Sequence, residues 1–370
     1  MKKIVALLLA ALMVLSLAAC GNKTAEEPAP APAPAESGEA PAPAPAVAGG
    51  KIAILVPNAD HGWTGAVMTY AEEKAAEINA AGAFEATVIT STDAANQITQ
   101  VEDIIENKTA DYVVILPQDN QLEATMKKLA DSGIPYIMFD RVIDSAAGTA
   151  VASVKGDNNG IGVATAERFI EKGMKAGDKI LIMPGDNSSV PQMRNDGFYG
   201  ALAAAGWTDA DMANIESTDY TGWSRSKGKE LFIAWLDSNT VETITNTKWI
   251  FTHDDEIAMG ILEALKSSEI DAEKKEAFLN AGVNLGTSSG LNEIYSVLKG
   301  IHQKDYTAEV ASLADLFSVT YDPAMIKIAI QDMIDYVEGK DVPQDHVIPV
   351  SVVDAANVNE FQGFGDPVSK

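Results

Sequence analysis

Short apolar segments alternate with longer amphipathic segments from Lys51 to Asp140. The apolar runs are KIAILVPN, EATVITS, DYVVILPQ and PYIMFD, and segments with helical periodicity such as WTGAVMTYAEEKAAEINAAG separate them. These runs are too uniformly apolar to expose one face to water, which is typical of parallel strands covered by helices on both sides. The pattern therefore predicts an α/β lobe with a doubly wound parallel sheet.

The same alternation restarts further along the chain. Apolar runs begin at residues 179, 248 and 276 (KILIMPG, KWIFTHDD and EAFLNAGVN), with helical segments such as EIAMGILEALKSS between them. Two series predict two such lobes, joined by hinge crossings at 150–162 and near 317–325. We expect the following lobe boundaries: 51–155 and 323–346 for the N-terminal lobe, 156–322 and 347–370 for the C-terminal lobe.

The first fifty residues have a different composition. Two lysines precede sixteen uncharged, mostly apolar residues, fewer than the ~20 needed to span a bilayer, so residues 1–19 are predicted to be an export signal. The signal ends in LAAC followed by Gly, which resembles a bacterial lipobox and implies that Cys20 is lipidated. Residues 20–50 are then expected to be a Pro/Ala-rich linker that cannot bury a core and that tethers the protein to the outer side of the membrane.

Composition excludes several classes of function. The net charge is −26 and no cluster of Lys and Arg is present, so nucleic acid is not an expected partner. Cys20 is the single cysteine, and the four histidines are scattered, so neither a disulfide nor a metal site is expected. The chain carries no nucleophile elbow and no phosphate loop, and we expect no cofactor.

Polar residues follow several of the predicted strands. Asp140 and Arg141 follow PYIMF, His61 comes soon after KIAILVPN, Asp254 follows WIFTH, and Asn284 follows NAGV. In open parallel sheets, ligands bind beyond the carboxyl ends of the strands, so these residues are predicted to face a cleft between the lobes. The alternative for Asp140 and Arg141 is a surface ion pair, worth only ~0–1 kcal/mol.

Four segments carry a resemblance to a known family. In order, FDRVI, RNDGF, GWSRSKGKEL and FTHDDEIAMGILEAL resemble the periplasmic sugar-binding proteins of ABC importers, such as the ribose, xylose and galactose receptors, over residues 51–353. The resemblance implies the type I periplasmic binding protein fold. It also implies a monomeric receptor, not an enzyme, that captures a monosaccharide between its lobes and delivers it to an ABC permease.

The resemblance implies roles for individual residues. A sugar calls for carboxylates and amides around its hydroxyls and for aromatic rings on its faces. Asp140 and Arg141 would form hydrogen bonds with the sugar hydroxyls, while Trp63 and Trp223 would stack on the faces of the sugar ring. The further ligand-binding residues expected are His61, Asn158 (ligand or hinge), Arg194, Asp254, Asn284 and Tyr321, with Asp322 as the alternative to Tyr321. Of Asp254 and Asp255, one is expected to cap the helix that follows and the other, Asp254, to face the ligand.

Three alternatives stay open. The same fold would serve a sensor that presents its ligand state to a chemoreceptor or a kinase. It would also serve a binder of nucleosides or of a furanosyl signal. A glycoside-processing enzyme would need two carboxylates flanking one glycosidic bond, whereas the acids here are paired with arginine or amide.

Overall fold

The computed structural model describes residues 49–58 and 62–365. They form two sheets of six strands, one in each lobe. The first sheet is parallel and has the order β11-β5-β4-β3-β1-β2. Its strands are β1 (Lys51–Pro57), β2 (Glu85–Ser91), β3 (Tyr112–Ile115), β4 (Tyr136–Phe139), β5 (Ala152–Gly156) and β11 (Asp345–Ile348).

Helices cover both faces of the first sheet. They are α1 (Gly62–Ala81), α2 (Ala94–Asn107), the 3-10 turn η1 (Asn120–Leu122), α3 (Glu123–Asp131), α4 (Asp144–Ala147) and α14 (Met325–Val337). Along β1, Ile52, Ile54 and Val56 pack on the α1 and α14 side, while Ala53 and Leu55 pack on the α2 and α3 side. Because successive side chains point to opposite faces, a strand buried on both sides must be apolar at every position.

The second sheet has the order β12-β10-β9-β8-β6-β7 and is parallel except for β12, which runs antiparallel to β10. Its strands are β6 (Lys179–Met183), β7 (Ile215–Ser217), β8 (Thr247–Thr252), β9 (Asn284–Ser289), β10 (Asp315–Thr320) and β12 (Val352–Val353). Its helices are α5 (Asn158–Glu171), α6 (Ser189–Ala204), α7 (Asp209–Met212), α8 (Arg225–Ser238), α9 (Val241–Asn246), α10 (Asp255–Lys266), α11 (Ala272–Asn280), α12 (Asn292–Leu298), α13 (Thr307–Ala311) and the 3-10 turn η2 (Val358–Glu360).

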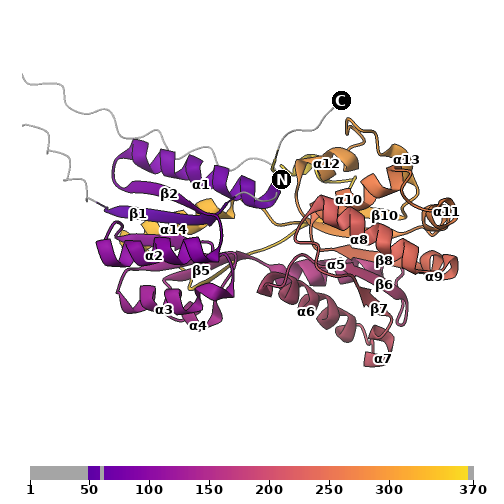
Figure 1. Ribbon diagram of the computed structural model, residues 1–370, viewed down its shortest axis with the longest axis horizontal. Helices are drawn as coiled ribbons and strands as arrows, with labels where there is room; N and C mark the ends of the chain where they lie inside the picture. Colours follow the sequence, from indigo (N-terminus) through magenta and orange to yellow (C-terminus); the bar gives the residue numbers. More distant parts are fainter. Residues whose placement is uncertain (1–48, 59–61, 366–370) are drawn as a thin grey trace, which may run out of the picture. The chain divides into compact units, whose positions relative to one another are not determined.

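The chain crosses between the lobes three times, after β5, after β10 and after β11. In Figure 1, α14 lies among the indigo and purple elements of the first lobe although it belongs to the last part of the chain. The last strand of the first sheet, β11, ends at Ile348, two residues beyond the crossing expected at 346. The predicted fold of two doubly wound lobes joined by crossings is confirmed.

One predicted strand is wrong. The apolar run EAFLNAGVN at 276 is the end of α11 and the turn that follows it, and the strand β9 begins only at Asn284. The sequence of β9 is NLGTSS, and all six residues are buried. The hydrophobic pattern did not predict this strand, because its buried side chains are mostly small or polar rather than apolar.

Candidate ligand-binding site

A cavity lies between the two lobes, and we call it the interlobe cavity. The space free of protein atoms in it and at its mouth is about 350 Å³, open solvent included. It is lined by Trp63, Asp140 and Arg141 of the first lobe, by Val190, Arg194, Trp223 and Asp254 of the second, and by Tyr321 of the second crossing. The polar strand ends of both lobes therefore meet at one place.

Asp140 follows β4 and is 5% exposed. Its φ of +60° is in the left-handed region, which Asp tolerates better than most residues. Its carboxylate accepts a hydrogen bond from the Tyr321 hydroxyl. Burial raises the pKa of Asp140, and the nearby Arg141 and the Tyr321 hydroxyl oppose this rise. A buried carboxylate with donors beside it is suited to accept hydrogen bonds from a bound ligand.

Arg141 reaches from the first lobe toward the second. Its guanidinium donates to the backbone carbonyl of Gln118, and Nη2 lies 3.7 Å from the carboxylate of Asp186, which follows β6. Burial alone would raise the pKa of Asp186, but hydrogen bonds from Ser188 and the neighbouring Trp223 and Arg141 hold it below its ordinary value. The ionised pair bridges the two lobes, and sequence reasoning missed Asp186.

Tyr321 lies on the second crossing and contacts residues of both lobes. Its hydroxyl donates to Asp140 and accepts from Nδ2 of Asn158 at 3.0 Å, while its backbone carbonyl accepts from the indole N–H of Trp63 at 2.8 Å. A Cβ atom on Gly156, at the first crossing, would lie 2.2 Å from the Tyr321 ring. A glycine is therefore needed there, because any other residue would displace the ring.

Arg194, on α6, is the most buried cation of the site, at 2% exposed. Its Nε donates to Oδ1 of Asn158 at 2.9 Å, and its Nη1 donates to the backbone carbonyl of His253 and to Oγ of Ser288 at 3.0 Å. Burial lowers the pKa of Arg194, while nearby groups that include Asp254 oppose this shift. Asn158, which does not line the cavity, fixes the orientation of the guanidinium.

Two glycines bring Arg194 to Asn158. A Cβ atom on Gly162 of α5 would lie 2.0 Å from the carbonyl oxygen of Arg194, and one on Gly197 of α6 would lie 2.0 Å from the carbonyl oxygen of Asn159. The helix backbones are therefore in direct contact, which side chains at these positions would prevent. This close crossing places the start of α5 beside the arginine.

Aromatic rings surround the cavity. The Arg194 guanidinium lies 5.4 Å from the ring centre of Trp223 and 4.9 Å from that of Tyr321. Trp223 has a φ of +60°, which is unusual for a bulky residue and is typical of strained positions at functional sites. Its ring occupies the space that a Cβ atom on Gly185 would need, at 2.3 Å. The indole N–H of Trp223 makes no well-formed hydrogen bond among the described residues, although it lies near Asp186.

The structure divides the roles of Asp254 and Asp255 differently from the prediction. Asp254 both lines the cavity and caps α10, because its carboxylate accepts from the backbone N–H of Glu256 at 2.8 Å. Burial and the neighbouring Asp255 raise the pKa of Asp254 well above its usual range. Asp255 points away into the second lobe, where the backbone N–H groups of Gly290 and Leu291 donate to it, each at 2.8 Å.

The remaining predicted residues lie elsewhere. Asn284 begins β9 instead of following a strand, and its amide faces the backbone carbonyl of Lys248, so its assignment to the cleft is wrong. The error follows from placing the strand too early. Asp322 caps the turn before α14 through the N–H of Ala324, which leaves Tyr321 as the residue of this pair at the cavity. His61 and Cys20 lie outside the described residues.

Comparisons with known proteins agree with this fold. Residues 52–341 match the model of the periplasmic binding protein domain. The chain belongs to this family. As a periplasmic binding protein it is a solute-binding protein and not an enzyme, and the resemblance to the sugar-binding proteins of ABC importers is confirmed. Its family acts outside the cytoplasm, and none of the helices in the described ranges is long and apolar enough to cross a membrane.

Individual relatives are distant. A fructose import binding protein of Bifidobacterium longum is 23% identical over 274 residues, which are 72% of this chain and 74% of that protein. A putative rhizopine-binding protein of Rhizobium meliloti is 23% identical over 335 residues, 86% of this chain and 98% of that protein.

Solved structures share the fold. A galactofuranose binding protein has a TM-score of 0.66 at 19% identity, over 84% of this chain and 96% of that chain. An ABC transporter solute binding protein from Bacillus halodurans with bound myo-inositol has a TM-score of 0.66 at 22% identity, over 85% of this chain and 97% of that chain. At such identities the likeness shows the fold alone, so the ligand has to be argued from the cavity.

Proposed function

We propose that this periplasmic binding protein captures a monosaccharide, a pentose or an aldohexose, in the interlobe cavity and delivers it to an ABC-type permease. The observation that carries the proposal is the lining of this cavity. Carboxylates of Asp140 and Asp254 and the guanidinium groups of Arg141 and Arg194 stand beside aromatic rings in this lining. A sugar offers hydroxyls that donate and accept and C–H faces that pack on rings, so it matches this lining.

In this proposal, the same ligand contacts provide the binding affinity and bring the two lobes together. Hydrogen bonds to charged groups contribute about 1.5–3 kcal/mol each, so a few of them reach the roughly −8 kcal/mol of micromolar binding after the cost of association. A ligand that touches Asp140 in one lobe and Arg194 in the other stabilises the closed arrangement of the lobes. The permease would recognise that closed form.

The ligands named for related proteins support a polyhydroxylated ring. They include fructose for the Bifidobacterium longum relative and galactofuranose and myo-inositol for the solved structures. A further structure, from Actinobacillus succinogenes, contains D-allose. Because one of these ligands is a furanose, the ligand screen described next also has to detect furanosyl ligands.

A thermal-shift screen against pentoses, hexoses, inositols and nucleosides tests the proposal. A ligand at 100 times its dissociation constant adds about 2.7 kcal/mol to the free energy of unfolding, which a melting curve detects. We expect a pentose or an aldohexose to raise the melting temperature. A shift with nucleosides alone would favour the nucleoside alternative, and no shift with any sugar would contradict the proposal.

Trp223 should report directly on the ligand. We expect Trp223→Phe to lose most of the ligand-induced change in intrinsic fluorescence and to weaken binding by about 1 kcal/mol, because a smaller ring offers less stacking area. The control is Trp235→Phe, since Trp235 packs in the second lobe away from the cavity and bonds Glu216. Equal changes in both variants would show that Trp223 does not contact the ligand.

We also propose that Cys20 carries a lipid that holds the protein at the membrane. Cys20→Ser should leave the melting temperature of the folded part unchanged, because the linker of residues 20–50 is too rich in Pro, Ala and Glu to build a core. The variant should, however, leave the membrane fraction or remain unprocessed. Fractionation of cells followed by immunodetection measures this, and unchanged membrane association would contradict the lipid anchor.

A further inference from the structure

A second cavity adjoins the interlobe cavity, and we call it the outer cavity. It encloses about 910 Å³, open solvent included, and Trp223 lines both cavities. Gly62 and Glu256 line the outer cavity, while Trp63 and Asp254, close to them in the sequence, line the interlobe cavity. Trp223 therefore lies at the boundary between the two cavities, and Gly62 and Glu256 lie near it, each within two residues of a residue that lines the interlobe cavity.

The lobes approach each other closely at this boundary. A Cβ atom on Gly62, at the start of α1, would lie 2.9 Å from Oε1 of Glu256 and 3.7 Å from a methyl group of Leu291. Both neighbours belong to the second lobe. A glycine at position 62 therefore lets the Glu256 side chain close the gap between the lobes.

Arg225 holds Glu256 in this position. Its Nε donates to Oε2 of Glu256 at 2.6 Å, so the other carboxylate oxygen is left for the Gly62 contact. The two residues are neighbours because α8 and α10 cross closely: a Cβ atom on Gly260 would lie 2.5 Å from the carbonyl oxygen of Arg225. The Glu256 side chain is 17% exposed, and its position is thus set by the second lobe.

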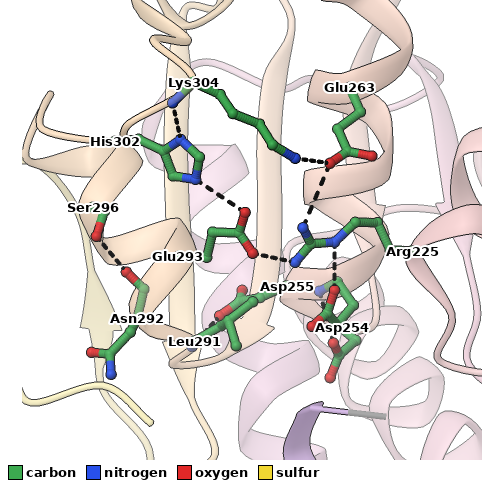
Figure 2. A network of polar contacts seen from close by, with 11 residues as sticks. Arg225, Asp254, Asp255, Glu263, Leu291, Asn292, Glu293, Ser296, His302 and Lys304 are labelled. Carbon is green, nitrogen blue, oxygen red and sulfur yellow. Dashed lines mark hydrogen bonds and ion pairs between the residues drawn. The ribbon is translucent and has the colours of Figure 1, made fainter. Parts of the chain in front are cut away.

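A ring of polar contacts fixes Arg225 in turn, and Figure 2 shows it. Arg225 donates to Glu293, whose other oxygen lies 3.0 Å from Nε2 of His302. Nδ1 of His302 accepts from the backbone N–H of Lys304, so Nε2 carries the proton and donates to Glu293. The ring closes through Glu263, which is 2.9 Å from Nζ of Lys304 and 3.6 Å from Arg225.

We propose that the contact of Glu256 with Gly62 determines which ligands fit. It separates the interlobe cavity from the outer cavity, and so it excludes sugars that carry a substituent directed toward the outer cavity, such as glycosides. This inference rests on the proposed function, because it takes the ligand to be a monosaccharide. Removing the Glu256 side chain would join the two cavities and give such a substituent room beside Ser224 and Ser226, whose hydroxyls are 3.0 Å apart.

The test compares each parent sugar with its derivatives. D-Ribose, D-allose, D-galactose and D-fructose are titrated by calorimetry together with their methyl glycosides and mono-O-methyl ethers. For the parent sugar that binds, we expect the native protein to reject the derivative methylated toward the boundary. In Glu256→Ala, the dissociation constant of that derivative divided by that of the parent sugar should be about tenfold lower than in the native protein. This is the size of effect that one methyl group has in a tight pocket. Derivatives methylated elsewhere should keep their ratios.

Two further variants sharpen the result. Lys229→Ala is the matched control, since Lys229 lines the outer cavity only and pairs with Glu269, and all ratios should stay unchanged. Gly62→Ala should raise the dissociation constant of the parent sugar about tenfold by overpacking the closed form, without lowering the melting temperature of the ligand-free protein.

Each outcome decides between distinct statements. If Glu256→Ala leaves every ratio as in the native protein while the parent sugar still binds, the proposed specificity contact is wrong and the receptor function stands. An unchanged affinity of Gly62→Ala for the parent sugar would likewise overturn the contact. If none of the four sugars nor any other sugar of the screen binds, the proposed function fails, independently of this contact.

Discussion

Asp140→Ala is expected to weaken sugar binding by about 2–5 kcal/mol, a loss typical of removing a buried, charged hydrogen-bonding group from an interface. Asp140 is 5% exposed, accepts from Tyr321 and lies beside Arg141. Its removal takes away an acceptor for ligand hydroxyls and removes a buried negative charge from beside Arg141 and Arg194. Calorimetric titration with the sugar found by the screen measures the loss.

Asp144→Ala is the control for this experiment. Asp144 lies four residues further along the chain, begins α4 and is exposed, so its loss should change affinity by no more than about 0.5 kcal/mol. If Asp140→Ala binds as tightly as this control, Asp140 does not contact the ligand and the proposed site is wrong.

Gly162→Ala is expected to lower the free energy of unfolding by about 1–3 kcal/mol or more, as overpacking does. The added Cβ would meet the carbonyl oxygen of Arg194 at 2.0 Å and the backbone nitrogen of Phe198 at 2.5 Å, so α5 and α6 must move apart. Because Arg194 is held by Asn158 at the start of α5, sugar affinity should fall as well. Thermal or denaturant unfolding and calorimetric titration measure the two effects.

Gly200→Ala, in the same pair of helices, should raise the free energy of unfolding instead of lowering it. Gly200 is exposed on α6, and a Cβ atom there meets nothing within 4 Å. Alanine has a higher helix propensity than glycine, so this variant should be more stable by up to about 1 kcal/mol, with unchanged affinity. The close helix crossing would be contradicted if both substitutions changed stability by the same amount.

The sequence predicted the fold well because most strands are buried on both faces and must therefore be apolar throughout. One strand that the pattern misplaced, β9, is buried but contains small and polar residues for reasons visible only in three dimensions. Gly286 leaves room for the ring of Phe317, and the Ser288 hydroxyl takes part in hydrogen bonds with Arg194 and with the carbonyl of His253. A pattern of hydrophobicity has no means of detecting such a strand.

The lining of the interlobe cavity was predictable where a residue lies within two positions of the end of a strand. Asp140, Arg141 and Asp254 were found in this way, and the same rule applied to KILIMPGD would also have found Asp186. By contrast, the left-handed backbone of Trp223 depends on a loop geometry that no local pattern specifies.

The three crossings have a consequence for the order of folding. In the first sheet, β11 pairs with β5, so Asp345 lies opposite Ser153, and α14 supplies part of the same core. The first lobe is therefore not encoded by one continuous segment, and its sheet cannot be completed until nearly the whole chain is present. Pairing over so long a stretch of chain is slow to form.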